Sequence, residues 1–315
     1  MTTVVFVAGV GRSGSTLLES ILGSLPRWIG VGETMHLPER GLRENQRCGC
    51  GESFFDCAFW SQVGTHAFGG WDRVDVDDWL GLAGRVDRNR NLPLLLRPNL
   101  SRDFAADHAR LVERLGSLML AAASVGDAEV VVESSKHPSY GLLLAADPRL
   151  DVRFVHVVRD SRGVAYSWTK KVPRPEIADR VEFMPTYPPA QIALRWLAWN
   201  GALSLVGARR ALPSLRIRYE DFVTDPTRVV QQVASFAGTA ADDATVDDIL
   251  ERGAADGQHS VAGNPMRFGT GPIRLRRDEQ WRSELRPRDR ALVTGVTAPM
   301  LCRYGYRLRP SKESV

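Results

Sequence analysis

The sequence predicts a three-layer α/β domain with a mostly parallel central sheet. Short runs rich in valine and other apolar residues alternate along the chain with segments whose apolar residues recur at helical spacing. The interior runs are continuously apolar rather than alternating, which is typical of parallel strands that helices cover on both faces. A glycine-rich turn follows the first of these runs, where a strand is expected to pass into a helix.

The first strand, loop, helix and second strand are expected to form a βαβ unit. The β-branched run Thr2–Ala8 predicts a buried strand. Leucine and isoleucine recur at helical spacing over residues 15–25, and Pro26 is expected to end that helix. Residues 27–32 predict the second strand, which closes the unit.

The segment from about residue 37 to residue 110 is irregular and rich in aromatic residues. We interpret it as an insertion that covers one end of the sheet and borders the acceptor. Repeats, low-complexity stretches and a clean linker are absent from the sequence, so we expect one domain over residues 1–315.

After the insertion, helical and strand patterns alternate again. Helices are predicted over residues 109–125, 141–147, 161–171 and 190–211, and another begins with Asp225 as its cap and Pro226 in the first position. Strands are predicted over residues 128–136, ending near Glu133, then over 152–160 and 214–222.

Composition and charge restrict the possible partners. The net charge of +4 is small, so we predict no nucleic-acid partner. Arginine dominates the basic residues, and its planar fork suits a compact anion such as phosphate or sulfate. No basic leader and no apolar run of about 18 residues is visible, so we expect a cytoplasmic protein without a membrane contact.

Three of the four cysteines cluster at Cys48, Cys50 and Cys57, whereas Cys302 stands alone. The spacing matches no common zinc pattern, and a fourth ligand would have to come from His66, His36 or elsewhere. The sequence therefore favours reduced thiols without a metal ion, and it leaves open whether these cysteines bind zinc.

The stretch "AGVGRSGSTLLES" nearly matches the phosphate-binding P-loop pattern. Gly9, Gly14 and Thr16 fit the pattern, but Ser15 stands where a lysine should follow the second glycine, and Arg12 supplies a cation earlier in the loop. Unpaired N–H groups at the start of the following helix favour an anion. Gly11 and Gly14 would let the backbone approach that anion, and hydroxyls of Ser13, Ser15 and Thr16 would add donors.

Polar residues lie at the ends of the predicted strands. Glu33 follows the second strand, Ser135 and Lys136 end the third, Arg159 and Asp160 end the fourth, and Tyr219 and Glu220 end the fifth. Because ligands of open parallel sheets bind beyond the carboxyl ends of the strands, these residues are expected to converge on one site.

The missing lysine bears on which anion is bound. A nucleotide kinase neutralises a triphosphate with Mg²⁺, which requires that lysine and an aspartate at a second strand end. Here Arg159 stands beside Asp160 and would compete with the metal. A sulfuryl group carries less charge than a phosphoryl group, so side-chain cations and loop N–H groups suffice to bind it.

Two motifs resemble those of sulfotransferases that use 3′-phosphoadenosine 5′-phosphosulfate (PAPS). "GRSGSTLLESIL" resembles the family's 5′-phosphosulfate loop, and "FVHVVRDSRGVAYS" resembles its 3′-phosphate motif, with Arg159 and Ser167 as ligands. "NPMRFGTGPIRLRRDEQW" is similar to the loop that closes over PAPS in bacterial members. That similarity implies Asn264 and Arg267 as further ligands, with 3′,5′-adenosine bisphosphate as the product.

The resemblance also implies catalytic roles. Glu33 is similar to the catalytic glutamate of tyrosylprotein-type members and would take the proton of the acceptor hydroxyl. His36 and His137 are rival bases. Lys136 would stabilise charge on the departing phosphate, and Arg12 would hold the sulfonate. Tyr219 is expected to stack on the adenine or to belong to the core.

The acceptor is left open by the sequence. We expect a small-molecule or carbohydrate hydroxyl, with the insertion and residues 172–189 shaping its pocket. A P-loop nucleotide kinase with a degenerate Walker A loop is the alternative, and an inactive nucleotide-binding protein is a third reading. The sequence does not predict an oligomeric state.

Overall fold

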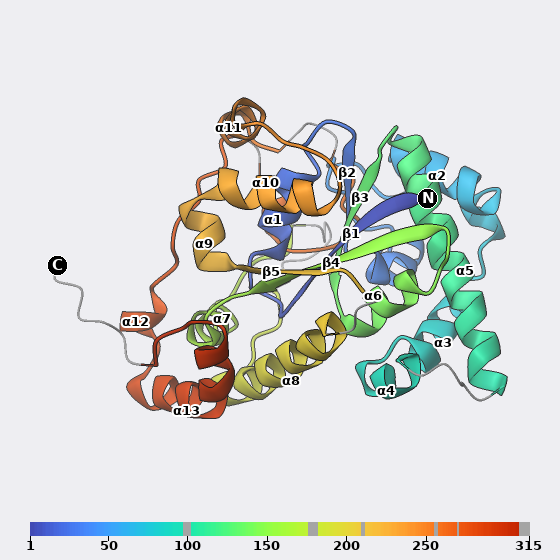
Figure 1. Cartoon of the computed structure of the whole chain (residues 1–315). Helices are drawn as coiled ribbons and strands as arrows, with labels where there is room; N and C mark the ends of the chain where they lie inside the picture. The colour runs from blue at the N-terminus through green and yellow to red at the C-terminus, as the bar shows by residue number, and fades with distance from the viewer. Residues whose placement is uncertain (97–101, 176–181, 209–211, 255–257, 270, 309–315) are drawn as a thin grey trace.

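The computed structural model describes residues 1–96, 102–175, 182–208, 212–254, 258–269 and 271–308 (Figure 1). Its core is a five-stranded sheet in the order β2-β3-β1-β4-β5. Every pair of neighbouring strands is parallel, which confirms the predicted α/β class. The strands are β1 (Thr2–Gly9), β2 (Trp28–Gly32), β3 (Val130–Lys136), β4 (Leu150–Val158) and β5 (Ser214–Arg218).

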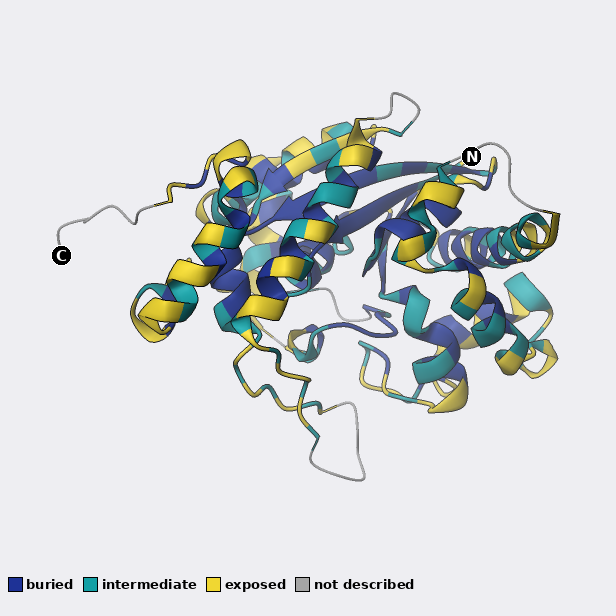
Figure 2. Cartoon of the chain, turned by 90° about the horizontal axis from the view of Figure 1, so that it is seen from below, coloured by how far each residue is buried: buried dark blue, intermediate teal, exposed yellow. Residues whose placement is uncertain are grey.

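Helices surround the sheet, and Figure 2 shows the strands buried between them. The helices are α1 (Ser15–Leu22), α2 (Ala58–Phe68), α3 (Val76–Val86), α4 (Leu92–Leu95), α5 (Arg102–Val125), α6 (Pro138–Ala145), α7 (Ser161–Ser167), α8 (Pro189–Gly207), α9 (Tyr219–Thr224), α10 (Pro226–Phe236), α11 (Asp243–Arg252), α12 (Trp281–Glu284) and α13 (Pro287–Arg303). The 3₁₀ helices are η1 (Thr34–His36), η3 (Trp71–Arg73), η4 (Asn89–Asn91) and η5 (Pro265–Phe268), and η2 (Leu37–Arg43) is a π-helix.

The central strand β1 explains why the layers form. Successive side chains of a strand point to opposite faces. Val4 and Phe6 therefore join one apolar cluster, which includes α5, α6 and the helices of the insertion. Val5 and Val7 join a second cluster with α1 and α10. Because both faces are buried, the strand needs the continuous apolar sequence that predicted it.

The insertion shares the first of these cores. Trp60 from α2 and Trp79 from α3 are buried in the cluster that contains β1 and β3 residues. The single-domain organisation stays a prediction.

Several element boundaries differ from the predicted ones. β3 continues to Lys136 instead of ending near Glu133. β5 ends at Arg218, and Tyr219 begins α9 rather than continuing the strand. The first helix ends at Leu22, where Gly23 caps it, before Pro26 is reached. The helix predicted over 161–171 ends at Ser167. α8 ends at Gly207, and residues 209–211, to which that helix was predicted to extend, lie outside the described residues.

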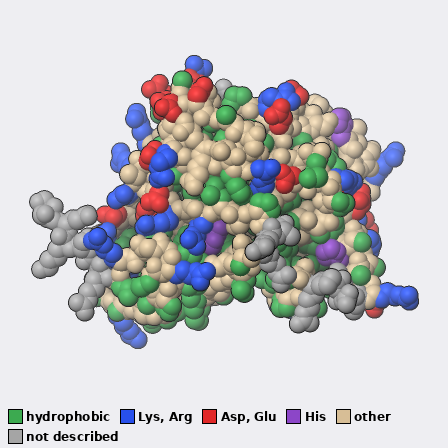
Figure 3. All heavy atoms as spheres, viewed as in Figure 1, with side chains coloured by type: hydrophobic (Ala, Val, Ile, Leu, Met, Phe, Trp, Pro, Cys, Tyr) green, Lys and Arg blue, Asp and Glu red, His purple; other side chains and the backbone are tan. Residues whose placement is uncertain are grey.

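Among the described helices, none is both long and apolar enough to cross a membrane. On the face shown in Figure 3, Lys and Arg side chains are interspersed with Asp and Glu, in agreement with the small net charge of +4.

Candidate active site

The strand ends converge on a cavity of about 480 Å³. The loop after β1, the residues after β2, the end of β3, and residues after β4 and β5 all contribute to its lining. A segment from the C-terminal part of the chain, including Gly263 and Asn264, closes another side. This is the arrangement expected for the carboxyl edge of a parallel sheet.

The cavity brings together most of the residues predicted for the site. Its lining includes Gly11, Arg12, Gly14, Ser15, Thr16, Glu33, His36, Lys136, His137, Arg159, Ser167, Tyr219 and Asn264. Two predicted cofactor ligands do not line it, and neither do Asp160 and Glu220, which were also expected to converge on the site. Ser13 of the loop is buried, and Arg267 donates to the backbone oxygens of Ser260 and Arg47, 3.3 and 3.1 Å away.

The loop between β1 and α1 packs tightly against two aromatic rings. A Cβ on Gly11 would lie 2.7 Å from the ring of Trp168, and one on Gly14 would lie 2.6 Å from Tyr219. Gly14 also has φ 91°, which favours glycine. No side chain caps the described α1, and its first turn holds no acidic residue. The N-terminal N–H groups of α1 are therefore left for an anion in the cavity.

Arg12 is a weakly engaged cation at this loop. Its backbone has φ 74°, a strained conformation for a residue other than glycine. Its guanidinium lies 5.1 Å from the Trp168 ring centroid and donates to Sδ of Met184 at 3.1 Å. Within the described part of the chain, its buried Nε has no hydrogen-bond partner. Burial lowers the pKa of Arg12, and a bound anion would offset that cost.

Arg159 connects the loop after β1 to Asp278 in the C-terminal part of the chain. Its Nη1 donates to the backbone oxygen of Arg12 at 2.9 Å, and its guanidinium lies 4.4 Å from the Tyr219 ring centroid. Its Nη2 pairs with the carboxylate of Asp278 at 3.1 Å. Lys170 also pairs with Asp278, at 3.4 Å. Both cations therefore share one carboxylate, and an incoming anion would be a second partner for them.

Glu33 and Lys136 form an ion pair on the next wall. Burial raises the pKa of Glu33, but the charges of Lys136 and His36 outweigh it and lower the pKa to about 2. Lys136 also donates to the backbone oxygen of Ser134 at 3.0 Å, and its φ of 69° is strained. Glu33 is therefore an ionised but weak proton acceptor for as long as this pair persists.

Both rival bases line the same cavity. Nε2 of His36 lies 3.6 Å from Oε2 of Glu33. His137 packs edge-on against Trp199, with ring centroids 5.0 Å apart. Burial lowers the pKa of each histidine to about 4. All three candidates are therefore in their proton-accepting form at neutral pH, and the choice of base stays a prediction.

Two buried carboxyl groups that the sequence did not single out hold the backbone around Glu33. Glu19 accepts from the N–H of Gly32 at 2.5 Å, and Glu133 accepts from the N–H of Thr34 at 3.0 Å. These bonds flank Glu33 on both sides. Burial raises the pKa of each carboxyl group to about 7. The sequence signal was weak, because each glutamate stands beside serines in an element that mixes polar and apolar residues.

The raised pKa of Glu133 predicts how stability depends on pH. Between its ordinary value of 4.5 and about 7, the folded chain retains a proton that the unfolded chain releases. Glu133 should therefore contribute a fall in stability as pH rises through this range, and this contribution levels off above it. The lowered pKa values of His36 and His137 contribute in the opposite direction, so the effect of Glu133 is measured as a difference from the wild type. Between pH 5 and 8, the stability of Glu133→Gln relative to the wild type should rise by about 1–3 kcal/mol, measured by urea unfolding. Glu39→Gln on η2 is the control, and a difference between Glu133→Gln and the wild type that does not change with pH would contradict the prediction.

Most lining beyond the strand ends comes from α8 and from the segment before it. Tyr187 lines the cavity, and so do Arg195 and Trp199 of α8. Of the described residues of the insertion, Arg40 alone lines it. The insertion was expected to shape the acceptor pocket, but its large aromatic side chains, such as Trp60, are mostly buried in the core.

A comparison with protein families identifies the class of protein. The model of the sulfotransferase domain family matches residues 2–257. The chain therefore belongs to the sulfotransferase domain family, and membership supports sulfuryl transfer as its reaction.

Solved structures agree on the fold. The sulfotransferase domain from the olefin synthase of Synechococcus PCC 7002 aligns with a TM-score of 0.52 at 20% identity, covering 98% of this chain and 96% of that one. The sulfotransferase domain from the curacin biosynthetic pathway aligns with a TM-score of 0.52 at 15% identity, covering 98% and 99%. A search of curated proteins finds no match for this chain.

Proposed function

We propose that this protein transfers a sulfuryl group from PAPS to a hydroxyl of a small-molecule or carbohydrate acceptor. The observation that carries the proposal is the convergence of three groups on one cavity. They are the loop with Arg12, the pair Arg159 and Ser167, and the ion pair of Glu33 with Lys136. The first two suit the two ends of PAPS, and the third suits proton removal beside a departing anion.

The cofactor has a natural orientation in this cavity. The 5′-phosphosulfate would lie at the N-terminus of α1, where N–H groups and the half-buried Arg12, whose Nε lacks a hydrogen-bond partner, can bind an anion. The 3′-phosphate lies at Arg159 and Ser167. It competes with Asp278 for the guanidinium, so cofactor binding requires that ion pair to loosen. Asn264, on the closing segment, contacts the cofactor from the other side.

The transfer is an in-line displacement at sulfur. The acceptor oxygen forms a bond to sulfur, and the bond from sulfur to the 5′-phosphate oxygen breaks. Glu33 takes the hydroxyl proton, and adenosine 3′,5′-bisphosphate leaves with the bonding electron pair. Lys136 turns from Glu33 to the leaving oxygen, where it stabilises the developing charge. Losing this partner raises the pKa of Glu33, so the carboxylate becomes a stronger base when the cofactor is present.

The acceptor lies on the side of Tyr187, Arg195 and Trp199. Aromatic rings with a few polar groups suit a sugar or a phenol, and the cavity volume lies within the range of small-molecule sites. This wall comes chiefly from α8, so substitutions there should change acceptor preference before they change cofactor affinity.

A metal-dependent kinase is the alternative, and Asp160 argues against it. A kinase would use this carboxylate to hold Mg²⁺. Instead, Arg162 binds both of its oxygens, at 2.9 and 2.6 Å, and both residues are buried. Asp160 is therefore part of a buried ion pair with Arg162.

A thermal-shift comparison tests the proposal. Adenosine 3′,5′-bisphosphate should raise Tm equally with and without added Mg²⁺, and more than adenosine 5′-monophosphate does, because only the bisphosphate engages Arg159. The proposal would be overturned by stabilisation that requires Mg-ATP and ignores the 3′-phosphate.

A further inference from the structure

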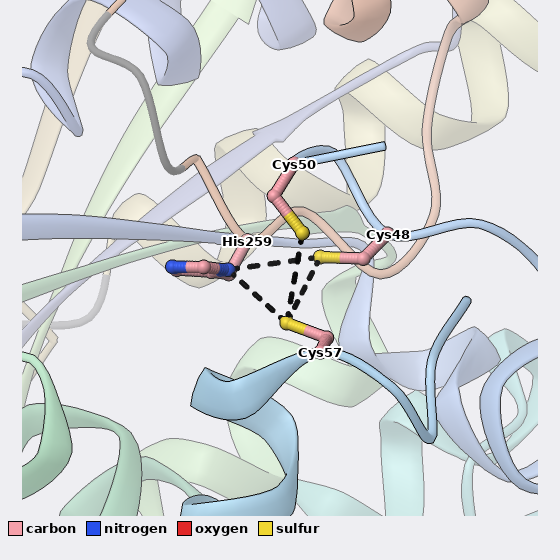
Figure 4. Close-up of side chains that lie close together, drawn as sticks. All are labelled: Cys48, Cys50, Cys57 and His259. Atoms are coloured by element: carbon pink, nitrogen blue, oxygen red, sulfur yellow. Dashed lines mark hydrogen bonds between the residues drawn. The ribbon is translucent and has the colours of Figure 1, made fainter. Parts of the chain in front are cut away.

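Three cysteines and one histidine meet at a site outside the cavity. Cys48 and Cys50 lie on the turn before α2, Cys57 caps the start of α2, and His259 comes from the C-terminal part of the chain (Figure 4). The three sulfurs and one ring nitrogen lie within 4.8 Å of one another. His259 supplies the ligand that the sequence lacked, and His36, an earlier candidate for that place, lies instead beside Glu33.

The distances fit the edges of a coordination tetrahedron. With metal–sulfur bonds of about 2.3 Å and a metal–nitrogen bond of about 2.0 Å, sulfur–sulfur edges are about 3.8 Å and sulfur–nitrogen edges about 3.5 Å. Sγ of Cys57 lies 3.7 Å from Sγ of both Cys48 and Cys50. Nδ1 of His259 lies 3.3 Å from Sγ of Cys57 and 3.8 Å from Sγ of Cys48. These separations are also far too long for a disulfide bond.

The surrounding residues hold the ligands in place. The ring of His259 stacks on Phe59, with centroids 4.4 Å apart and an interplanar angle of 6°. Nε1 of Trp60 donates to the backbone oxygen of His259 at 2.9 Å. Such contacts fix the orientation of a metal-binding histidine before the ion arrives.

We propose that Cys48, Cys50, Cys57 and His259 bind one zinc ion in a closed structural site. Three thiolates and one imidazole are a common zinc donor set, and four protein ligands leave no open position for a reaction at the metal. Edges of this length enclose a single ion, whereas an iron–sulfur cluster needs its ligands further apart. The site joins two segments that are distant in the sequence, since Cys48 and His259 are 211 positions apart.

The zinc ion anchors the segment that closes the cavity. Just after His259, Val261 donates to Val31 of β2 at 3.1 Å, and the N–H of Glu33 donates to Ala262 at 3.3 Å. Arg267 reinforces the junction through its bonds to Ser260 and Arg47. Loss of the ion should therefore loosen Gly263 and Asn264 at the cavity. This second step rests on the proposed function, whereas the metal site does not.

Elemental analysis of the full chain tests the metal site directly. The protein is purified without chelators or a nickel column, and about one zinc ion per chain is expected. A mercurial reagent that caps thiols should release it, as followed with a zinc-binding dye. Cys57→Ser and His259→Ala should lose the ion, whereas Cys302→Ala, which changes the exposed cysteine of α13, should retain it.

A cobalt titration of the wild-type chain tests the site without substitutions that could prevent folding. The zinc-free wild-type chain should bind about one Co²⁺ and develop the intense visible bands of tetrahedral thiolate coordination, which added zinc abolishes. A chain that contains no metal and takes up neither ion would overturn the proposal. So would a disulfide within the cluster, or iron in place of zinc.

Adenosine 3′,5′-bisphosphate then tests the link to the cavity. Its affinity should fall several-fold when zinc is removed and return when zinc is restored. Zinc content does not depend on sulfuryl transfer, so the metal site and the proposed function can fail separately. Unchanged affinity in the zinc-free chain would overturn the anchoring role alone.

Discussion

Glu33→Gln should lower kcat by about 10²–10⁴-fold, the usual contribution of a general base. Glutamine keeps the size and hydrogen-bonding capacity of the side chain but cannot take the proton of the acceptor. Affinity for adenosine 3′,5′-bisphosphate should change little, because the proposed cofactor contacts come from Arg12, Arg159 and the N-terminus of α1. Transfer of radiolabelled sulfur from PAPS to the best acceptor of a panel of phenols and sugars measures kcat, and calorimetry measures the affinity.

Matched variants identify the base. Glu39→Gln removes an exposed carboxylate of η2 that pairs with Arg43 and should leave kcat unchanged. His36→Gln and His137→Gln should reduce kcat less than Glu33→Gln does. A fully active Glu33→Gln together with an inactive histidine variant would move the base to that histidine.

The pH profile provides a further check on Glu33. Since kcat/KM reports on the free enzyme, a base with a pKa of about 2 gives no acid limb between pH 5 and 8. In contrast, kcat reports on the bound state, where Lys136 has turned to the cofactor. Its acid limb should therefore lie at a higher pH than that of kcat/KM.

The sequence could predict the location of the site because the fold is regular there. In a parallel sheet, residues that end neighbouring strands must meet at one edge. Glu33, Lys136, Arg159 and Tyr219 could therefore be grouped without knowing the strand order. Their positions at the ends of predicted strands were enough to group them, and no knowledge of side-chain packing was needed.

Contacts between distant loops could not be predicted in this way. The residues after His259 hold it near the cysteines, because Ser260 accepts from the N–H of Gly49, and Val261 and Ala262 bond to the chain at the end of β2. No local pattern in the sequence encodes these contacts. Likewise, α8 was predicted as a helix, but which of its faces lines the cavity depends on how α13 packs against it. Gly11 and Gly14 were interpreted as making room for a ligand, whereas the structure places the rings of Trp168 and Tyr219 where their side chains would lie.

Arg159→Gln should lower the affinity for adenosine 3′,5′-bisphosphate about 10- to 100-fold, as expected for losing ~1.5–3 kcal/mol of hydrogen bonding to a charged group. The affinity for adenosine 5′-monophosphate should change little, so the variant should no longer prefer the nucleotide with a 3′-phosphate. Calorimetry with both nucleotides measures this ratio, which a general loss of folding would not change selectively. Arg228→Gln, at the exposed start of α10, is the control.

Asp278 sharpens the interpretation of this variant. Its carboxylate already lies 3.1 Å from Arg159, so the 3′-phosphate must share or displace it. Asp278→Asn removes that competing charge and should therefore raise the affinity for the bisphosphate several-fold, whereas Arg159→Gln should lower it. If Asp278 serves mainly to orient Arg159, both variants weaken binding instead, and the 3′-phosphate is then held by an arginine that needs its carboxylate partner. If Arg159→Gln retains the full preference for the bisphosphate, the 3′-phosphate lies elsewhere in the cavity and the proposed orientation of PAPS is wrong.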